Sequence, residues 1–326
     1  MTHGIRENDS MISVGETPWH GLGTTLQTPP ATAAEALELA GLNWEVRKLP
    51  MFLEDGRMVD LRESVSRSND GTPGCVIRTD TNEILGVVGP AYTVYQNASM
   101  GALFDPLIQD GTITIETAGS LFGGRRVWML GKFGQNAQID RNDEVAKYLL
   151  LAHGHDGRFA VRFGFTPIRV VCRNTLSASI NDENSKLMRC LHTANLEQNL
   201  IVLRNAMQAA EQVFDLTAEQ YRLLASRGVN RTDLREYARQ VIKADEDESK
   251  RSNPEKEKIA AIMTNAMHGK GNRGSNWWHA YNGVTEYICW QAGRDAQNRV
   301  SEAWWGSGQS MSQRALELAV QMSGLA

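Results

Sequence analysis

Alternation of hydrophobic and polar residues predicts a β-hairpin near the middle of the chain. Residues 147–153 form an apolar run of strand length, and residues 154–157 (GHDG) are rich in turn formers. Residues 158–165 then alternate with a period of two, which is typical of a strand that is buried on one face. The pattern therefore predicts two antiparallel strands joined by a short turn.

The second strand of this hairpin has two chemically different faces, because successive side chains of a strand point to opposite sides. One face is expected to carry Phe159, Val161, Phe163 and Phe165. The other is expected to carry Arg158 and Arg162, with small residues between them. Two interpretations stay open for that face: a solvated surface with ordinary arginines, or a cationic surface that binds a polyanion.

The segments before the hairpin are mostly strand-like. Thr32 and Glu35 form a capping-box pattern that predicts a short helix ended by Gly41. A second helix is expected between residues 97 and 111. Strand patterns occur within residues 44–65, 75–88, 112–117 and 125–133.

From residue 193 onward the apolar positions recur at spacings of three and four, which indicates helices. Pro254 is well placed in the first turn of one helix, and Ser275 is expected to cap the next. The mixed charge run at residues 245–258 is interpreted as a solvated linker. A last helix is expected over residues 312–322.

These patterns predict an α+β fold, with an N-terminal β-rich part that contains a mainly antiparallel sheet and a helical C-terminal part. Residues 1–190 are expected to form a β-rich α+β domain with a basic sheet face. Residues 191–326 are expected to form a helical region that packs on this domain. The long helical stretch after residue 193 makes the boundary between the two parts soft.

Composition narrows the class of protein. The chain has 326 residues, is 41% hydrophobic and 22% charged, and carries a net charge of −4, which fits a globular protein and disfavours general coating of DNA. No run of 18 apolar residues and no apolar N-terminal segment occurs, so we expect a cytoplasmic protein without a membrane partner. The four cysteines form no CxxC pair, and we expect neither a cofactor nor a structural metal.

Histidines and cysteines offer a weaker hypothesis. His153, His155 and Asp156 carry metal-ligand atoms, although a tight turn with local backbone bonds explains the same residues. Cys190 and His192, taken with Cys172, raise a second possibility of zinc binding or cysteine–histidine catalysis, but no spacing supports it. No hydrolase motif is present, so a non-enzymatic protein is expected, and an unrecognised enzyme that uses His153, His155 or Cys172 is the remaining alternative.

Basic residues concentrate in the central strands, in the most cationic part of an otherwise acidic chain. The expected phosphate-contacting residues are Arg125, Arg126, Arg158, Arg162, Arg169 and Arg173. Five of the eight tryptophans lie between Trp277 and Trp305. Packing of helices explains most of these indoles, but Trp278, with Trp304 and Trp305, is a candidate for an exposed ring that stacks on bases.

Several segments resemble the phage/plasmid-like protein family, domain of unknown function 932. They are residues 18–23 (PWHGLG), 95–97 (YQN), 170–176 (VVCRNTL) and 278–287 (WHAYNGVTEY), which together span most of the chain. The resemblance implies an accessory role in a mobile element, and it brings no established activity and no catalytic residue. A weaker architectural resemblance is to phage single-strand annealing proteins of the RecT and Redβ type, and it rests on pattern alone.

The resulting functional expectation is a phage- or plasmid-encoded protein that binds nucleic acid, in particular single-stranded DNA during replication or recombination. It is also expected to form a homo-oligomer, because long apolar helices and a late tryptophan cluster exceed what one small sheet covers. The alternative is a protein-interaction or anti-defence factor that binds a host protein through its acidic surface and tryptophan-rich region.

Overall fold

A computed structural model describes most of the chain. The described residues are 10–15, 23–59, 72–141, 143–169, 188–192, 207–272, 276–293, 299, 302–303 and 306–324.

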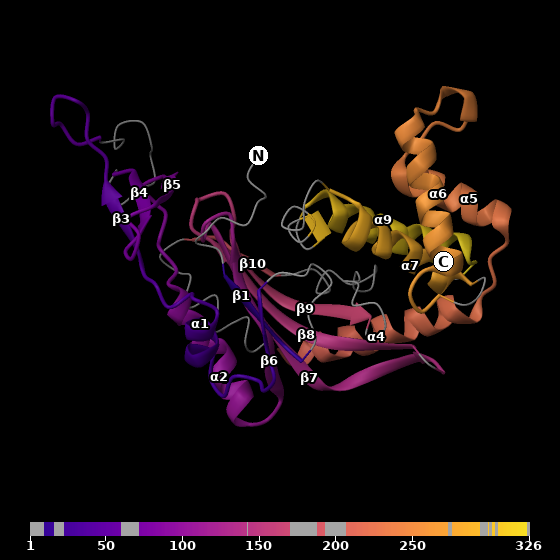
Figure 1. The fold of residues 1–326 in the computed structure, drawn as a ribbon, viewed down its shortest axis with the longest axis horizontal. Coiled ribbons are helices and arrows are strands. Elements are labelled where there is room, and N and C mark those ends of the chain that lie inside the picture. Colours follow the sequence, from indigo (N-terminus) through magenta and orange to yellow (C-terminus); the bar gives the residue numbers. More distant parts are fainter. Residues whose placement is uncertain are drawn as a thin grey trace.

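A seven-stranded sheet forms the centre of the molecule (Figure 1). In spatial order its strands are β10 (Met188–Cys190), β9 (Val161–Arg169), β8 (Asp143–Gly154), β7 (Arg126–Asp140), β6 (Ile113–Leu121), β1 (Met11–Val14) and β2 (Thr24–Leu26). Every neighbouring pair is antiparallel except β1 and β2. The predicted, mainly antiparallel sheet is therefore confirmed.

Strands β8 and β9 are the predicted central hairpin. They pair antiparallel, with Leu149 opposite Phe165 and Ala152 opposite Arg162. The turn between them covers residues 155–160 and is longer than the predicted four residues. Phe159 therefore belongs to the turn and not to the strand, which frees it from the alternation that fixes Val161 and Phe163.

An N-terminal layer covers one face of the sheet. It contains α1 (Ala33–Leu39), a 3-10 helix η1 (Asn97–Met100) and α2 (Gly101–Gln109), and α1 and α2 both contact β6. A small second sheet follows the order β3 (Val46–Pro50), β4 (Gly74–Arg78) and β5 (Ile84–Val88). Strand β5 lies against the β8–β9 turn, because a Cβ atom on Gly86 would be 2.6 Å from Asp156 Cα.

The helical C-terminal part covers the other face. Helix α4 (Met207–Ser226) contacts β7 and β9. It is followed along the chain by α5 (Arg231–Ile242), the 3-10 helix η3 (Glu248–Lys250), α6 (Asn253–His268), α7 (Trp277–Glu286), the π-helix η4 (Tyr287–Gln291) and α9 (Ser307–Met322). Figure 1 shows α4 beneath the sheet and the later helices gathered at one side of it. A β-rich N-terminal part and a helical C-terminal part make the fold α+β, as predicted.

Local signals explain where the helices begin. Thr32 Oγ1 accepts a hydrogen bond from Glu35 N, but the Glu35 carboxylate accepts from Ala31 N, so only half of the predicted capping box forms. A complete capping box between Ser252 and Glu255 starts α6, with Pro254 in its first turn as predicted. Asn276 caps α7, whereas the predicted cap, Ser275, lies outside the described residues.

Two hydrophobic cores, one on each face of the sheet, bury alternate residues of the same strands. Along β8, Leu149 and Leu151 belong to the core under α1 and α2, whereas Leu150 and Ala152 belong to the core shared with the C-terminal helices. Arg162 lies opposite Ala152 and therefore on the helix-covered face. Arg162 of the predicted basic face is half-buried there, so only part of its side chain is open to a ligand.

Helix α7 lies at the centre of the C-terminal core. All of its residues from Trp277 to Thr285 are buried. A Cβ atom on Gly283 would be 2.7 Å from both Ile262 O and Ala266 N, so glycine permits the close approach of α6 to α7. No helix in the described part of the chain combines the length and apolar character needed to cross a membrane.

Candidate functional site

Two neighbouring turns bring several predicted arginines to one end of the central sheet. The β6–β7 turn ends at Arg125, and His155 N in the β8–β9 turn donates a hydrogen bond to Arg125 O at 3.1 Å. Arg125, Arg126 and Arg158 therefore lie near one another although the two turns are about thirty residues apart in the sequence. The buried Nε of Arg125 has no hydrogen-bond partner among the described residues.

These arginines differ in how much of their charge is available. Arg126 Nη1 forms an ion pair with Asp156 Oδ1 at 2.7 Å, and both side chains are largely buried. The guanidinium carbons of Arg126 and Arg162 lie 4.7 Å and 4.5 Å from the centre of the Phe159 ring. Arg158 is exposed. We call the side chains of Arg125, Arg126, Arg158 and Arg162 the hairpin-end arginines.

The remaining predicted contacts are not brought into this group. Arg169 is the last residue of β9 at the far end of that strand, and its side chain lies outside the described part. Arg173 also lies outside the described residues. No common basic surface that includes these two arginines is therefore defined.

Trp278 is a core residue, so its predicted exposure for base stacking is wrong. Its side chain is fully buried, and its indole Nε1 donates a hydrogen bond to Asp143 Oδ2 at 2.7 Å. The Trp278 ring centre lies 4.7 Å from that of Tyr221 on α4. The indole joins α7 to the start of β8 and to α4. Trp304 and Trp305 lie outside the described residues.

The structure joins two weak sequence signals into one buried cluster of histidines. His153 and His155 on β8 and its turn have ring centres 4.7 Å apart. His192, beyond β10, stacks on Tyr92 at 4.7 Å and lies with its Nδ1 3.2 Å from Thr93 O. Tyr95 contacts the His153 ring edge-on at 4.9 Å. We call His153, His155 and His192 the histidine cluster.

Burial keeps the histidine cluster neutral. Desolvation lowers the pKa of His153 well below its usual value, and the neighbouring histidines add to the effect. Desolvation, followed by the charges of His192, Arg126 and Arg78, lowers the pKa of His155 to about 3. Within the described ranges, no group of three or more His, Cys, Asp or Glu side chains has a geometry that could hold a metal ion.

A pocket between α5 and α6 is a further candidate site, and sequence reasoning missed it. Its volume is about 560 Å³. Its lining residues come from α5, from the connection around η3 and from one face of α6, and they are Arg231, Thr232, Arg235, Glu248, Arg251, Lys256, Ile259, Ala260, Met263, Thr264 and Met267. Arg231 and Arg235 share a face of α5 because they are four residues apart. The mixed charge run at residues 245–258, which the sequence indicates as a solvated linker, contributes part of the wall of this pocket.

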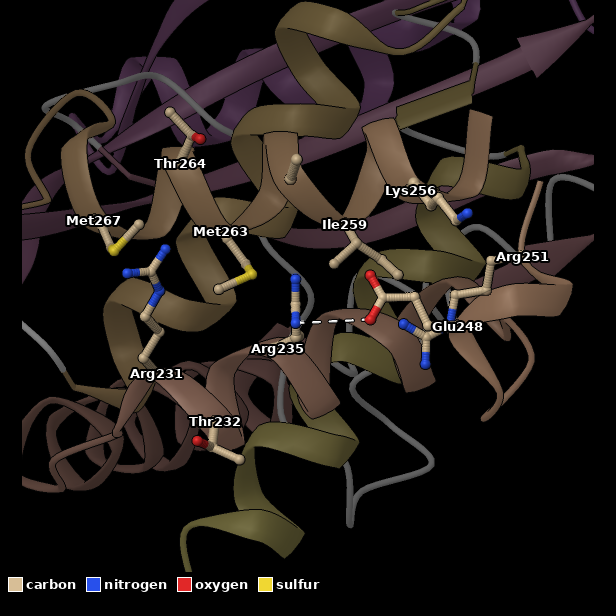
Figure 2. Close-up of a pocket in the computed structure, with 11 residues that line it drawn as sticks. Arg231, Thr232, Arg235, Glu248, Arg251, Lys256, Ile259, Met263, Thr264 and Met267 are labelled. Carbon is tan, nitrogen blue, oxygen red and sulfur yellow. Dashed lines mark ion pairs between the residues drawn. The ribbon is translucent and has the colours of Figure 1, made fainter. Parts of the chain in front are cut away.

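The pocket combines a cationic rim with an apolar floor. Its charged residues are Arg231, Arg235, Arg251 and Lys256 against the single carboxylate of Glu248. Figure 2 shows the Arg231 side chain beside Met267 at one end, and Arg251 and Lys256 at the other.

Of the rim charges, Arg235 is held loosely, whereas Arg251 donates hydrogen bonds to Asp245 O and Glu246 O. The floor is fixed. Arg235 and Glu248 form an ion pair of 3.8 Å between the two ends of the pocket, with 59% of each side chain exposed (Figure 2). Such an exposed pair is weak and exchanges readily with another anion. Ile259 and Met263 of the floor are buried in the C-terminal core. We call this site the α5–α6 pocket.

Comparison with known proteins identifies one family. The model of a domain of unknown function, DUF932, matches residues 84–305, which is more than half of the chain. No curated protein and no solved structure matches the chain, so the architectural resemblance to single-strand annealing proteins has no support from them. The matched range contains the hairpin-end arginines, the histidine cluster and the α5–α6 pocket. The chain belongs to the DUF932 family.

Proposed function

We propose that this protein binds nucleic acid and that the α5–α6 pocket is its principal contact. The observation that carries the proposal is the excess of positive charge at the pocket, where four cationic side chains surround one carboxylate. The chain as a whole is acidic, with a net charge of −4, so this concentration is local. Local positive charge attracts a polyanion although the net charge of the protein opposes it.

The length of the pocket favours a chain of phosphates over a single anion. Lys256 and Met267 mark its two ends on α6, and eleven helical residues rise by about 16 Å. Cationic side chains stand at both ends. One small anion would meet only one end, whereas a nucleic-acid backbone presents a charge to each.

The hairpin-end arginines are a second proposed contact. Arg158 is exposed, and the buried Nε of Arg125 has no partner among the described residues. Arg158 retains donors for a phosphate, whereas the Arg125 Nε is buried away from solvent and Arg126 is already paired with Asp156. Arg158 is therefore the member of this group that the proposal uses most.

Binding of labelled oligonucleotides at several salt concentrations tests the proposed function. Phosphate contacts release condensed counterions, so the logarithm of the binding constant should fall linearly with the logarithm of the salt concentration, by about 0.7 per contact for a single strand. Fluorescence anisotropy with a single-stranded DNA is the measurement. Absence of binding in about 50 mM salt would contradict the proposal.

The alternative, a protein-interaction factor, loses part of its basis. Trp277 and Trp278 are buried in the core and are not available to a partner protein. Trp290 is 42% exposed and remains accessible. Two further predictions belong to this proposal: self-association into a homo-oligomer, and participation in replication or recombination. Sedimentation of the purified protein measures the self-association.

A further inference from the structure

We infer that the α5–α6 pocket receives unpaired bases, so that the protein selects single-stranded over double-stranded nucleic acid. This inference rests on the proposed function and adds a ligand class to it. The reason for it is the floor of the pocket, which a ligand that contacts the protein only through phosphates would not touch. Four of the floor residues are apolar: Ile259, Ala260, Met263 and Met267.

The floor and the rim are arranged for two different parts of a nucleotide. The apolar side chains follow one face of α6 at spacings of one, three and four residues, and they form a continuous strip along the helix. Arg231 and Arg235 of α5 stand along one side of this strip, and Arg251 and Lys256 stand at one end of it. A ligand that fills the pocket therefore needs an apolar body with negative charges at its edges.

A single strand meets this requirement and a duplex does not. In a duplex the bases are stacked and paired inside, and only the charged backbone reaches a pocket outside the grooves. An unpaired base can turn toward the protein and place its flat apolar face on side chains, while its flanking phosphates stay at the rim. Methionine suits this contact because its thioether side chain is flexible and polarisable.

The dimensions agree with this occupant. A volume of about 560 Å³ lies within the usual range of pockets that hold small organic groups. Ile259 and Met263 are buried and fixed by the core beneath them, whereas Ala260 is exposed and Met267 is half-buried. The floor is therefore preformed at its centre, and it does not need to be assembled by the ligand.

The competing occupant is an acidic amphipathic peptide, which also has apolar and negative groups. The ion pair between Arg235 and Glu248 weighs against it, because Glu248 places a negative charge between Arg235 and the Arg251 end of the pocket and repels a carboxylate there. A nucleotide can place its uncharged base beside Glu248 and its phosphates on the cationic side chains of the rim. The charge pattern therefore favours nucleic acid.

The test compares three forms of one oligonucleotide under identical salt: the single strand, its duplex, and the same sugar–phosphate chain with its bases removed. We expect the single strand to bind about tenfold more tightly than either of the other two, which is the effect of one or two base contacts. Equal binding of all three forms would overturn the inference and leave the proposed function standing. Absence of binding by any form would overturn both.

A double variant separates the floor from the rim. Ala260→Gln with Met267→Gln changes the two most accessible floor positions, keeps every charge and uses a good helix former. We expect this variant to lose about tenfold in affinity for the single strand, with an unchanged salt slope and unchanged affinity for the base-free chain.

Met311→Gln is the matched control, because Met311 lines a different cavity of about 480 Å³ beside α9 and η4. Circular dichroism should show all variants folded. The inference would be overturned if Met311→Gln lost as much affinity for the single strand as the floor variant does. It would also be overturned if an acidic peptide bound tightly to the original protein, and the floor variant lost this peptide binding but still bound the oligonucleotide.

Discussion

His155 Nε2 lies 3.1 Å from Asn97 Oδ1, and both side chains are buried. The Asn97 amide nitrogen donates to Leu42 O at 2.9 Å, which turns its oxygen toward the histidine. The His155 ring therefore donates from Nε2, and its Nδ1 has no partner within the described residues. This contact ties the β8–β9 turn to the segment before α2 through a neutral imidazole.

Acid should weaken the fold at a higher pH than carboxyl groups explain. In the folded state the pKa of His155 is about 3, and that of His153 is well below its usual value, whereas both are near 6.5 in the unfolded chain. Below pH 6.5 the unfolded state therefore binds more protons than the folded state. The contribution of the neutral rings to stability is complete above pH 6.5, and it is lost as the pH falls below that value. Between pH 7.5 and 5 we expect a loss of about 2 kcal/mol from His155, and a further loss in the same direction from His153.

Urea unfolding at pH 7.5, 6.5, 5.5 and 5.0 measures this loss. Glu236, whose pKa is lowered to about 2 by its hydrogen bond to Arg239, stays ionised throughout the window. A free energy of unfolding that stays constant between pH 7.5 and 5 would contradict the neutral, buried cluster.

His153→Phe should raise stability and reduce its pH dependence. Both ring nitrogens of His153 are buried without hydrogen-bond partners in the described structure, and this arrangement costs free energy. Phenylalanine keeps an aromatic ring against Tyr95 and His155. We expect a gain of about 1 kcal/mol at pH 7.5 and a smaller loss at pH 5. Destabilisation of the variant at neutral pH would show that His153 makes a polar contact.

Trp278→Phe should weaken the fold and spare the binding of nucleic acid. The change removes the hydrogen bond to Asp143 and part of a ring that is fully buried against Tyr221. We expect the free energy of unfolding to fall by about 2–4 kcal/mol, measured by urea denaturation. Because the indole does not reach the surface, a folded variant should bind oligonucleotides normally, and a selective loss of affinity would contradict its burial.

Helices and strands could be predicted from the sequence more readily than the tertiary contacts that cover each of them. The alternation around Phe163 identified β9 and the pairing of the hairpin, because a strand buried on both faces still repeats every two residues. It did not reveal that helices cover the face of Arg162, since this depends on packing of residues far along the chain. Phe159 was misplaced because the turn extends to residue 160 and interrupts the alternation.

Buried polar residues explain the error at Trp278. Helix α7 contains Asn282 and Thr285, which look like surface residues in the sequence, but both are buried. Asn282 Nδ2 donates to Trp278 O and Thr285 Oγ1 donates to Asn282 O, so the helix itself accepts from both donors, while Asn282 Oδ1 has no partner among the described residues. A helix that is buried on all sides therefore had the polar pattern of one that is half-exposed.

The candidate sites were hidden for a different reason. His153 and His192 come together only through pairing of β10 with β9, which no local pattern encodes. The α5–α6 pocket was visible in part, because Arg231 and Arg235 have helical spacing, but the charges near Lys256 resemble those of an exposed linker. Only the packing of α5 against α6 places the two groups around one floor.

Arg158→Gln tests how much the hairpin-end arginines contribute to binding. Arg158 is exposed, so its replacement should not disturb the fold. If its guanidinium contacts one phosphate, the salt slope for a single strand should flatten by about 0.7. Fluorescence anisotropy across a salt series measures this change. If the slope flattens by more than the loss of one phosphate contact explains, the main interface lies at the hairpin end and not at the pocket.

The most direct measurement of the central claim is the salt dependence of single-strand binding by Arg231→Gln/Lys256→Gln, which removes one cation from each end of the α5–α6 pocket. The matched control is Lys243→Gln/Lys258→Gln, which removes the same charge from two exposed positions outside this pocket, one directly after the end of α5 and one on α6. We predict that the pocket variant binds more weakly, with a slope flattened by about 1.4, and that the control keeps the original slope. Equal slopes for the pocket variant, the control and the original protein would contradict the account.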